Sequence, residues 1–121
     1  MGPAANVLDV QATVASESRT AGKHGEALCR AVSAASGITT NFNGPWFDNH
    51  FAANGYVAPR VAVPDRRRMV FEWGADRMTA RDALIRLLGR SAATMTWRLM
   101  CEPSAQPADR FCSLNVLALT R

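Results

Sequence analysis

Hydrophobic residues follow two different spacings along this 121-residue chain, and the spacings divide it into predicted strands and helices. Over residues 7–14 they alternate with polar ones, which is typical of a strand with one buried face. Similar strand-like tracts return over 38–42, 60–63, 69–73, 95–101 and 112–119. Residues 16–22 are polar and turn-forming, so we expect them to connect the first strand to the element that follows.

Two other segments repeat hydrophobic residues every three or four positions, which predicts helices with one buried face. The first predicted helix covers residues 23–35 and ends before Gly37, a residue that favours a helix C-terminus. The second covers residues 80–90 and follows Thr79, whose hydroxyl can cap it in a capping-box-like pairing with Asp82. The buried stripes are Leu28, Ala31, Val32 and Ala35 in the first helix, and Ala83, Leu84, Leu87 and Leu88 in the second.

The two helices share a sequence signature. Glu26-Ala27-Leu28-Cys29-Arg30 recurs as Asp82-Ala83-Leu84-Ile85-Arg86, and each copy leads into a strand-like tract. The chain therefore uses a small α/β unit twice. This order predicts an α+β fold of the βαββαββ type, with both helices side by side on one face of a small mixed sheet. We expect its core to include Leu28, Val32, Met69, Phe71, Trp73, Leu84, Leu87, Leu88 and Trp97.

Length and composition indicate a single domain over residues 1–121. We expect residues 1–6 to precede the fold, either as a disordered start or as an addition from cloning. No window approaches the roughly 20 apolar residues that span a bilayer. No signal peptide is visible at the N-terminus. The net charge of +4 permits contact with nucleic acid or an anionic surface but does not require it.

Residues 43–59 form a long predicted loop with an unusual content of aromatic side chains. Gly, Pro and Asn interrupt regular structure there, yet the loop carries Trp46, Phe47, Phe51 and Tyr56. One interpretation is a satellite hydrophobic cluster that holds the loop against the sheet. The other is an exposed patch for a protein partner, because aromatic residues are enriched in interface hot spots. The sequence leaves both open.

The three cysteines are an odd set. Cys101 and Cys112 flank the loop of the predicted final hairpin, where alternation allows both thiols to point to the same side. A disulfide there would indicate an oxidising compartment, and two reduced core thiols are the alternative. We expect Cys29, on the first helix, to be a small buried hydrophobe rather than a nucleophile.

Catalytic, metal and cofactor chemistry has little support in the sequence. The only histidines are His24 and His50, and neither has an obvious nucleophile at a suitable spacing. We therefore expect no enzyme activity, no metal and no cofactor, with a small enzyme using a site near His50 as a remote alternative. Arg66, Arg67 and Arg68 could support a basic nucleic-acid-binding surface. A solvated turn between two strands is the favoured interpretation of that run.

The helix signatures resemble the secretin and TonB N-terminal short domain family. Residues 26–38, EALCRAVSAASGI, are similar to the family's "ALxxLaxxtGl" tract, and residues 78–88, MTARDALIRLL, to its "xTlxeALdxLL" tract. Thr96-Trp97-Arg98 is similar to the aromatic context of the following strand. The likeness extends roughly from Leu8 to Leu119, with longer connections at 43–59 and 102–111.

The resemblance implies a βαββαββ module that docks to other envelope proteins and does not catalyse a reaction. It therefore implies a periplasmic or cell-envelope location and a protein partner in the envelope. The residues alone leave a cytoplasmic location open as well. Because the 43–59 loop departs from the family pattern and concentrates aromatic residues, it is the predicted docking surface.

Overall fold

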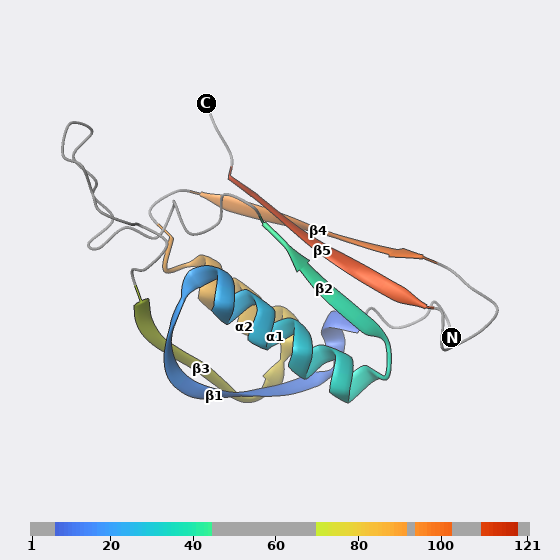
Figure 1. Ribbon diagram of the computed structural model, residues 1–121, viewed down its shortest axis with the longest axis horizontal. Coiled ribbons are helices and arrows are strands. Elements are labelled where there is room, and N and C mark those ends of the chain that lie inside the picture. The colour runs from blue at the N-terminus through green and yellow to red at the C-terminus, as the bar shows by residue number, and fades with distance from the viewer. Residues whose placement is uncertain (1–6, 45–69, 92–93, 103–109, 119–121) are drawn as a thin grey trace.

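Two helices lie side by side between a two-stranded and a three-stranded sheet (Figure 1). The computed structural model describes residues 7–44, 70–91, 94–102 and 110–118. After a short 3-10 helix, η1 (Val7–Asp9), the elements are β1 (Gln11–Thr20), α1 (Ala21–Ser36), β2 (Thr39–Asn43), β3 (Val70–Thr79), α2 (Ala80–Leu88), β4 (Met95–Glu102) and β5 (Phe111–Ala118). The predicted α+β class and the βαββαββ order are confirmed.

The strands form two sheets rather than one. β1 pairs with β3 in an antiparallel ribbon that curves beneath the helices (Figure 1). The other sheet has the order β2-β5-β4, with β2 parallel and β4 antiparallel to β5. The helices thus lie on one face of a small mixed sheet, as predicted, but a second sheet covers their other side.

Each helix begins at a threonine that caps its first turn. The Thr20 hydroxyl accepts a hydrogen bond from the Lys23 amide at 3.3 Å, and the Thr79 hydroxyl accepts one from the Asp82 amide at 3.2 Å. These caps satisfy N–H groups that a helix start leaves without partners. Gly37 ends α1 in the left-handed conformation, with φ of 76°. The predicted cap at Thr79 and stop at Gly37 are confirmed.

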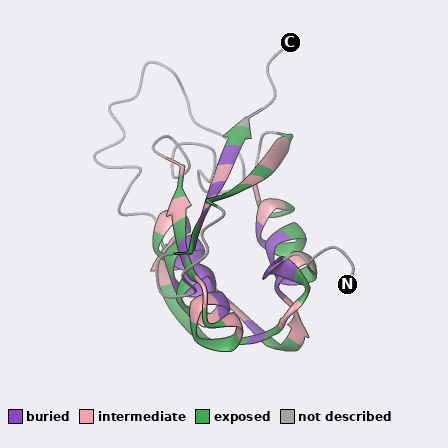
Figure 2. Ribbon diagram, turned by 90° about the vertical axis from the view of Figure 1, so that its right-hand side faces the viewer, coloured by how far each residue is buried: buried purple, intermediate pink, exposed green. Residues whose placement is uncertain are grey.

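The core forms where the two apolar helix stripes meet each other and the inner face of β5. The largest fully buried side chains include Leu28, Val32, Leu84, Leu87 and Leu114. Figure 2 shows buried segments on both helices and on β5. Trp73 is also buried, as predicted. Phe71, Leu88 and Trp97 were also predicted to be buried, but they are only partly buried and pack against the edge of the core.

Gly25 allows α1 to approach β2 closely. A Cβ atom at this position would lie 2.5 Å from two ring carbons of Phe42, which is shorter than real Cβ contacts. The helix and the Phe42 ring can therefore pack directly on each other only because residue 25 has no side chain.

The β1–β3 ribbon contains two β-bulges on opposite strands. From the pair Ala12–Met78 to the pair Val14–Ala75, β1 advances two residues while β3 advances three. From there to the pair Glu17–Trp73, β1 advances three residues while β3 advances two. The first bulge contains Arg77, the one described non-glycine residue with positive φ, at 51°. The two extra residues cancel, and the original register returns.

The predicted boundaries at the start of the chain were wrong. Residues 7–9 form η1 rather than strand, and residues 16–20, predicted as a connection, continue β1. The ladder with β3 satisfies the backbone there, so strand structure persists although the side chains at 15–18 are exposed. α1 consequently starts at Ala21, before the predicted position, and α2 ends at Leu88, before Arg90.

Candidate functional site

Several predicted site residues fall outside the part of the chain that the structure describes. They are the loop aromatics Trp46, Phe47, Phe51 and Tyr56, the arginines Arg66, Arg67 and Arg68, and His50. The predicted strand at 60–63 and Met69 also lie there. These assignments remain predictions, and the candidate sites below are built from other residues.

A disulfide joins β4 to β5. Cys101 and Cys112 are directly paired residues of the two strands, with an S–S distance of 2.05 Å. Cys112 lies on the buried face of β5 beside Leu114, whereas Cys101 is exposed. The bond therefore closes the β4–β5 hairpin at the end where residues 103–109 connect the strands.

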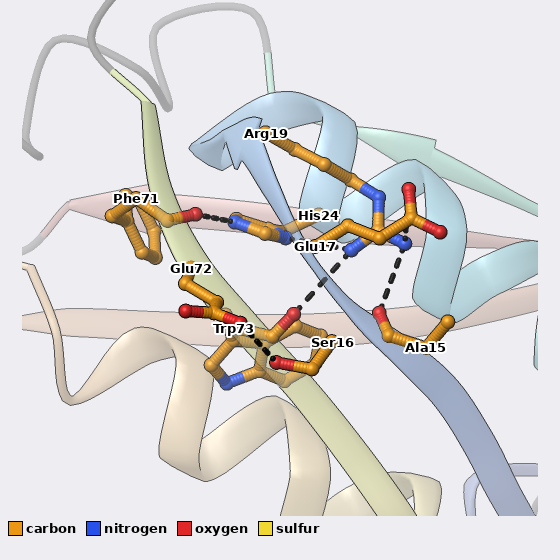
Figure 3. Close-up of polar contacts among 8 residues, drawn as sticks. All are labelled: Ala15, Ser16, Glu17, Arg19, His24, Phe71, Glu72 and Trp73. Atoms are coloured by element: carbon orange, nitrogen blue, oxygen red, sulfur yellow. Dashed lines mark hydrogen bonds and ion pairs between the residues drawn. The ribbon is translucent and has the colours of Figure 1, made fainter.

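His24 is at the centre of a polar cluster between α1 and the β1–β3 ribbon (Figure 3). Its Nε2 lies 2.6 Å from the carbonyl oxygen of Phe71, and its Nδ1 lies 3.2 Å from Nη1 of Arg19. The ring is fully buried and packs at a tilt against Phe71 and edge-on against Trp73. Burial, followed by the charges of Arg19 and Arg90, lowers the pKa of His24, although its bond to the Phe71 carbonyl acts in the opposite direction.

Arg19 connects this cluster to the bulged part of the ribbon. Its guanidinium donates to the carbonyl oxygens of Ala15, at 3.0 Å, and Trp73, at 3.4 Å, besides contacting His24. Nη2 also lies 3.4 Å from a carboxylate oxygen of Glu17. One side chain thus joins two strands and a helix.

The His24 cluster and Cys29 do not form a nucleophile–base pair. Both imidazole nitrogens are bonded to other groups, so neither is free to accept a thiol proton. Cys29 is 2% exposed, and burial together with the charge of Glu26 raises its pKa to about 12. At neutral pH the thiol is therefore protonated, as expected for a small buried hydrophobe.

A shallow groove runs between α2 and β4. Its volume is about 380 Å³, and its apolar lining comes from Ile85 and Leu88 of α2 and from Met95 and Trp97 of β4. Ile85 is 52% exposed. Outside this lining, the guanidinium of Arg81 lies 5.5 Å from the centre of the Trp97 ring and forms an ion pair with Asp9 at 3.0 Å. The surface of Ile85, Leu88, Met95 and Trp97 is the apolar floor of the groove, and Gly89, Ser91, Thr94 and Thr96 complete its lining.

The outer edge of β4 borders this groove. Within the described ranges, β4 pairs with β5 on one side and with no strand on the other. The Cα atoms of Cys101 and Cys112 are 3.9 Å apart, which indicates the closer, non-hydrogen-bonded type of antiparallel pair. By alternation, Trp97 and Leu99 also belong to pairs of this type. Their N–H and C=O groups therefore point away from β5. These outward groups are positioned to hydrogen-bond to a strand added at this edge.

Sequence reasoning missed both features, although signals were present. His24 lies four residues before Leu28 and eight before Val32, on the buried stripe of the helix. Ile85 is the apolar residue between Leu84 and Arg86, on the flank of the α2 stripe. A histidine on a buried stripe and an isoleucine beside one are the patterns that would have identified them.

The described residues contain no group of three His, Cys, Asp or Glu side chains that could hold a metal ion. Among the same residues, no helix is both long and apolar enough to cross a membrane. Comparisons of this chain with protein-family models, curated proteins and solved structures found no match.

Proposed function

We propose that this protein is a non-enzymatic protein–protein interaction module of a bacterial cell envelope, similar to the secretin and TonB N-terminal short domains. Its site is the α2–β4 groove together with the open edge of β4. The observation that carries the proposal is this juxtaposition of a partly exposed apolar floor, around Ile85 and Trp97, with β4 backbone groups that pair with no other described strand.

Two further observations support the assignment. The β-α-β-β-α-β-β order is the order that the family resemblance implied. The Cys101–Cys112 disulfide fits an oxidising compartment such as the bacterial periplasm. Neither observation identifies the partner. The basic nucleic-acid surface and the enzyme site near His50 depend on residues outside the described ranges, and no described contact favours either.

An extended segment of a partner protein fits this site. Added as a strand to the edge of β4, it would hydrogen-bond to the outward backbone groups and place every second side chain over the groove. The apolar floor would favour hydrophobic side chains at those positions. Arg98 projects from the other face of β4 and is exposed, so acidic side chains at the alternate positions would be favoured there.

Replacing Ile85 with glutamate should weaken binding of such a segment at least tenfold. The substitution places a charge on the apolar floor, and loss of an interface anchor commonly costs more than about 1 kcal/mol. The probe is a peptide selected against the oxidised protein from a phage-displayed library, with its dissociation constant measured by fluorescence anisotropy. Amide shifts on peptide binding should concentrate in β4 and α2.

Leu117 offers a matched control for this experiment. It is 56% exposed, close to the value for Ile85, but lies on β5 and outside the groove lining. Leu117→Glu should leave affinity within about twofold of the parent value. Equal sensitivity to both substitutions would argue against the groove. Loss of binding in Trp46→Ala/Phe47→Ala, with Ile85→Glu unaffected, would instead place docking on the predicted aromatic loop.

The envelope location is tested separately. Expressed from its full open reading frame in its native host, the protein should appear in the periplasmic or membrane fraction after osmotic shock. Recovery in the cytoplasmic fraction, alongside a cytosolic marker enzyme, would contradict the location and leave the binding experiment unaffected.

A further inference from the structure

We propose that His24 and Arg19 form an acid-sensitive latch, which holds the start of β3 against α1 and β1 and opens when the imidazole is protonated. The latch consists of the His24 ring, the Arg19 guanidinium and the carbonyl oxygens of Ala15, Phe71 and Trp73 (Figure 3). It is independent of the docking site, because none of these residues lines the α2–β4 groove.

The contacts fix the protonation state of His24. A guanidinium can only donate hydrogen bonds, so the 3.2 Å contact with Arg19 requires Nδ1 to accept. A carbonyl oxygen can only accept, so the 2.6 Å contact with Phe71 requires a proton on Nε2. Both requirements are met only by the neutral imidazole with its proton on Nε2.

A second proton would break this arrangement on the Arg19 side. Nδ1 would become a donor facing the Nη1 donor 3.2 Å away, and two positive charges would be in contact in a buried site. Arg19 cannot move away without consequence. Its 15% exposed side chain also holds the carbonyl oxygens of Ala15 and Trp73 beside the bulge. Protonation would therefore disturb both strands of the ribbon.

Among the residues that the structure describes, the charged groups around the cluster do not supply an equally close anion. From the α2 side, Arg90 lies over the Phe71 ring at 4.6 Å and donates to the Glu72 carbonyl, adding positive charge. Glu17 of β1 pairs with Arg19 but is 62% exposed, so solvent screens it. Glu72 of β3 accepts from the Ser16 hydroxyl. On α1 itself, Glu26 pairs with Lys23 and faces solvent.

The direction of the pH effect follows from the lowered pKa of His24. Above a pH of about 6.5, the ordinary histidine value, the ring is neutral in the folded and the unfolded chain, so its contribution to stability does not vary. Below that pH the unfolded chain binds a proton that the folded chain resists. Stability therefore falls as the pH drops from 6.5 to the folded pKa, by up to about tenfold in the folding equilibrium per pH unit.

The position of the latch determines which segment of the fold would loosen at low pH. Phe71 is the second residue of β3, and residues 45–69 join the described fold at Val70. Opening the latch would loosen the start of β3 first, because the core cluster around Leu84 and Leu114 contains no side chain that gains a proton in the acid range. The expected response is local loosening of β3 before global unfolding.

The test is an NMR titration of both histidines in the full-length, oxidised protein from pH 7.5 to 5. His24 should show the Nε2–H tautomer at neutral pH and a midpoint below 6.5, and amide protection at Trp73 should fall as it titrates. Arg19→Gln, which keeps a donor but removes the charge, should move the His24 midpoint upward. A His24 midpoint at or above 6.5 in the parent protein would overturn the latch.

The pH dependence of stability tests the latch independently of the NMR titration. Between pH 7 and 5, the denaturant midpoint of the parent should fall, and His24→Gln should remove most of that fall. His50→Gln is the matched control, because it removes the only other histidine, and it should retain the parent pH dependence. The same pH dependence in His24→Gln and the parent would contradict the proposal. If His24→Gln does not fold, the titration of the parent and of Arg19→Gln decides the question.

Discussion

Leu84→Ala should lower the free energy of unfolding by about 2–5 kcal/mol. Leu84 is fully buried in the α2 stripe, where it belongs to the core shared with Leu28, Leu87 and Leu114. Alanine removes the contacts of the leucine side chain and leaves a cavity that a close-packed core fills only in part. Urea unfolding followed by far-ultraviolet circular dichroism measures the loss.

Ile85→Ala is the control for this prediction, because it makes a similar truncation one residue along the same helix. Its side chain is about half exposed, so the expected loss is below about 1 kcal/mol. A larger loss for Ile85→Ala than for Leu84→Ala would mean that α2 is rotated and presents its other flank to the core. It would also remove the apolar floor from the proposed docking groove.

Reducing the Cys101–Cys112 disulfide should destabilise the oxidised protein by about 3 kcal/mol. The two cysteines are 11 residues apart in the sequence, and closing a loop of this size limits the conformations of the unfolded chain. Urea unfolding with and without a phosphine reductant measures the difference. Non-reducing peptide mapping should recover the pair as one cross-linked species, with Cys29 as the free thiol.

Cys101→Ala separates the cross-link from packing. Cys101 is exposed, so its replacement removes the bond with little loss of buried surface. The reductant should then cause no further destabilisation. Recovery of Cys101 and Cys112 as free thiols from an oxidising preparation of the parent would count against both the cross-link and the envelope location.

The helices were predictable because their information is local. The stripe around Leu28 and Leu84, the cap at Thr79 and the stop at Gly37 all depend on residues within a few positions of each other. The β1–β3 ribbon was less predictable, because its length and register depend on partner residues 50 or more positions away in the sequence. Polar residues 16–20 look like a turn until that partner supplies their hydrogen bonds.

The candidate sites were also hard to predict, because they depend on contacts between residues that are distant in the sequence. The repeated acid-Ala-Leu-x-Arg signature places Cys29 and Ile85 at equivalent positions, yet Cys29 is buried and Ile85 is exposed. The difference arises because α1 packs against strands of both sheets, whereas the Ile85 flank of α2 borders the groove beside β4. Likewise, the position of His24 indicates burial, but its bond to Phe71 joins residues 47 apart. Local patterns predict which face is buried, and tertiary packing decides what covers it.

The paired bulges of the β1–β3 ribbon act as compensating frame shifts. Deleting one residue from either bulge alone would offset one flank of the ribbon against the other and turn every following side chain to the opposite face. Gly74 lies beside the second bulge, and a side chain there would clash with β1, because a Cβ would lie 2.7 Å from the Ser16 backbone. A change of length in one strand of this region therefore disturbs the ribbon least when it is matched by a change in the other strand, because the two extra residues then still cancel.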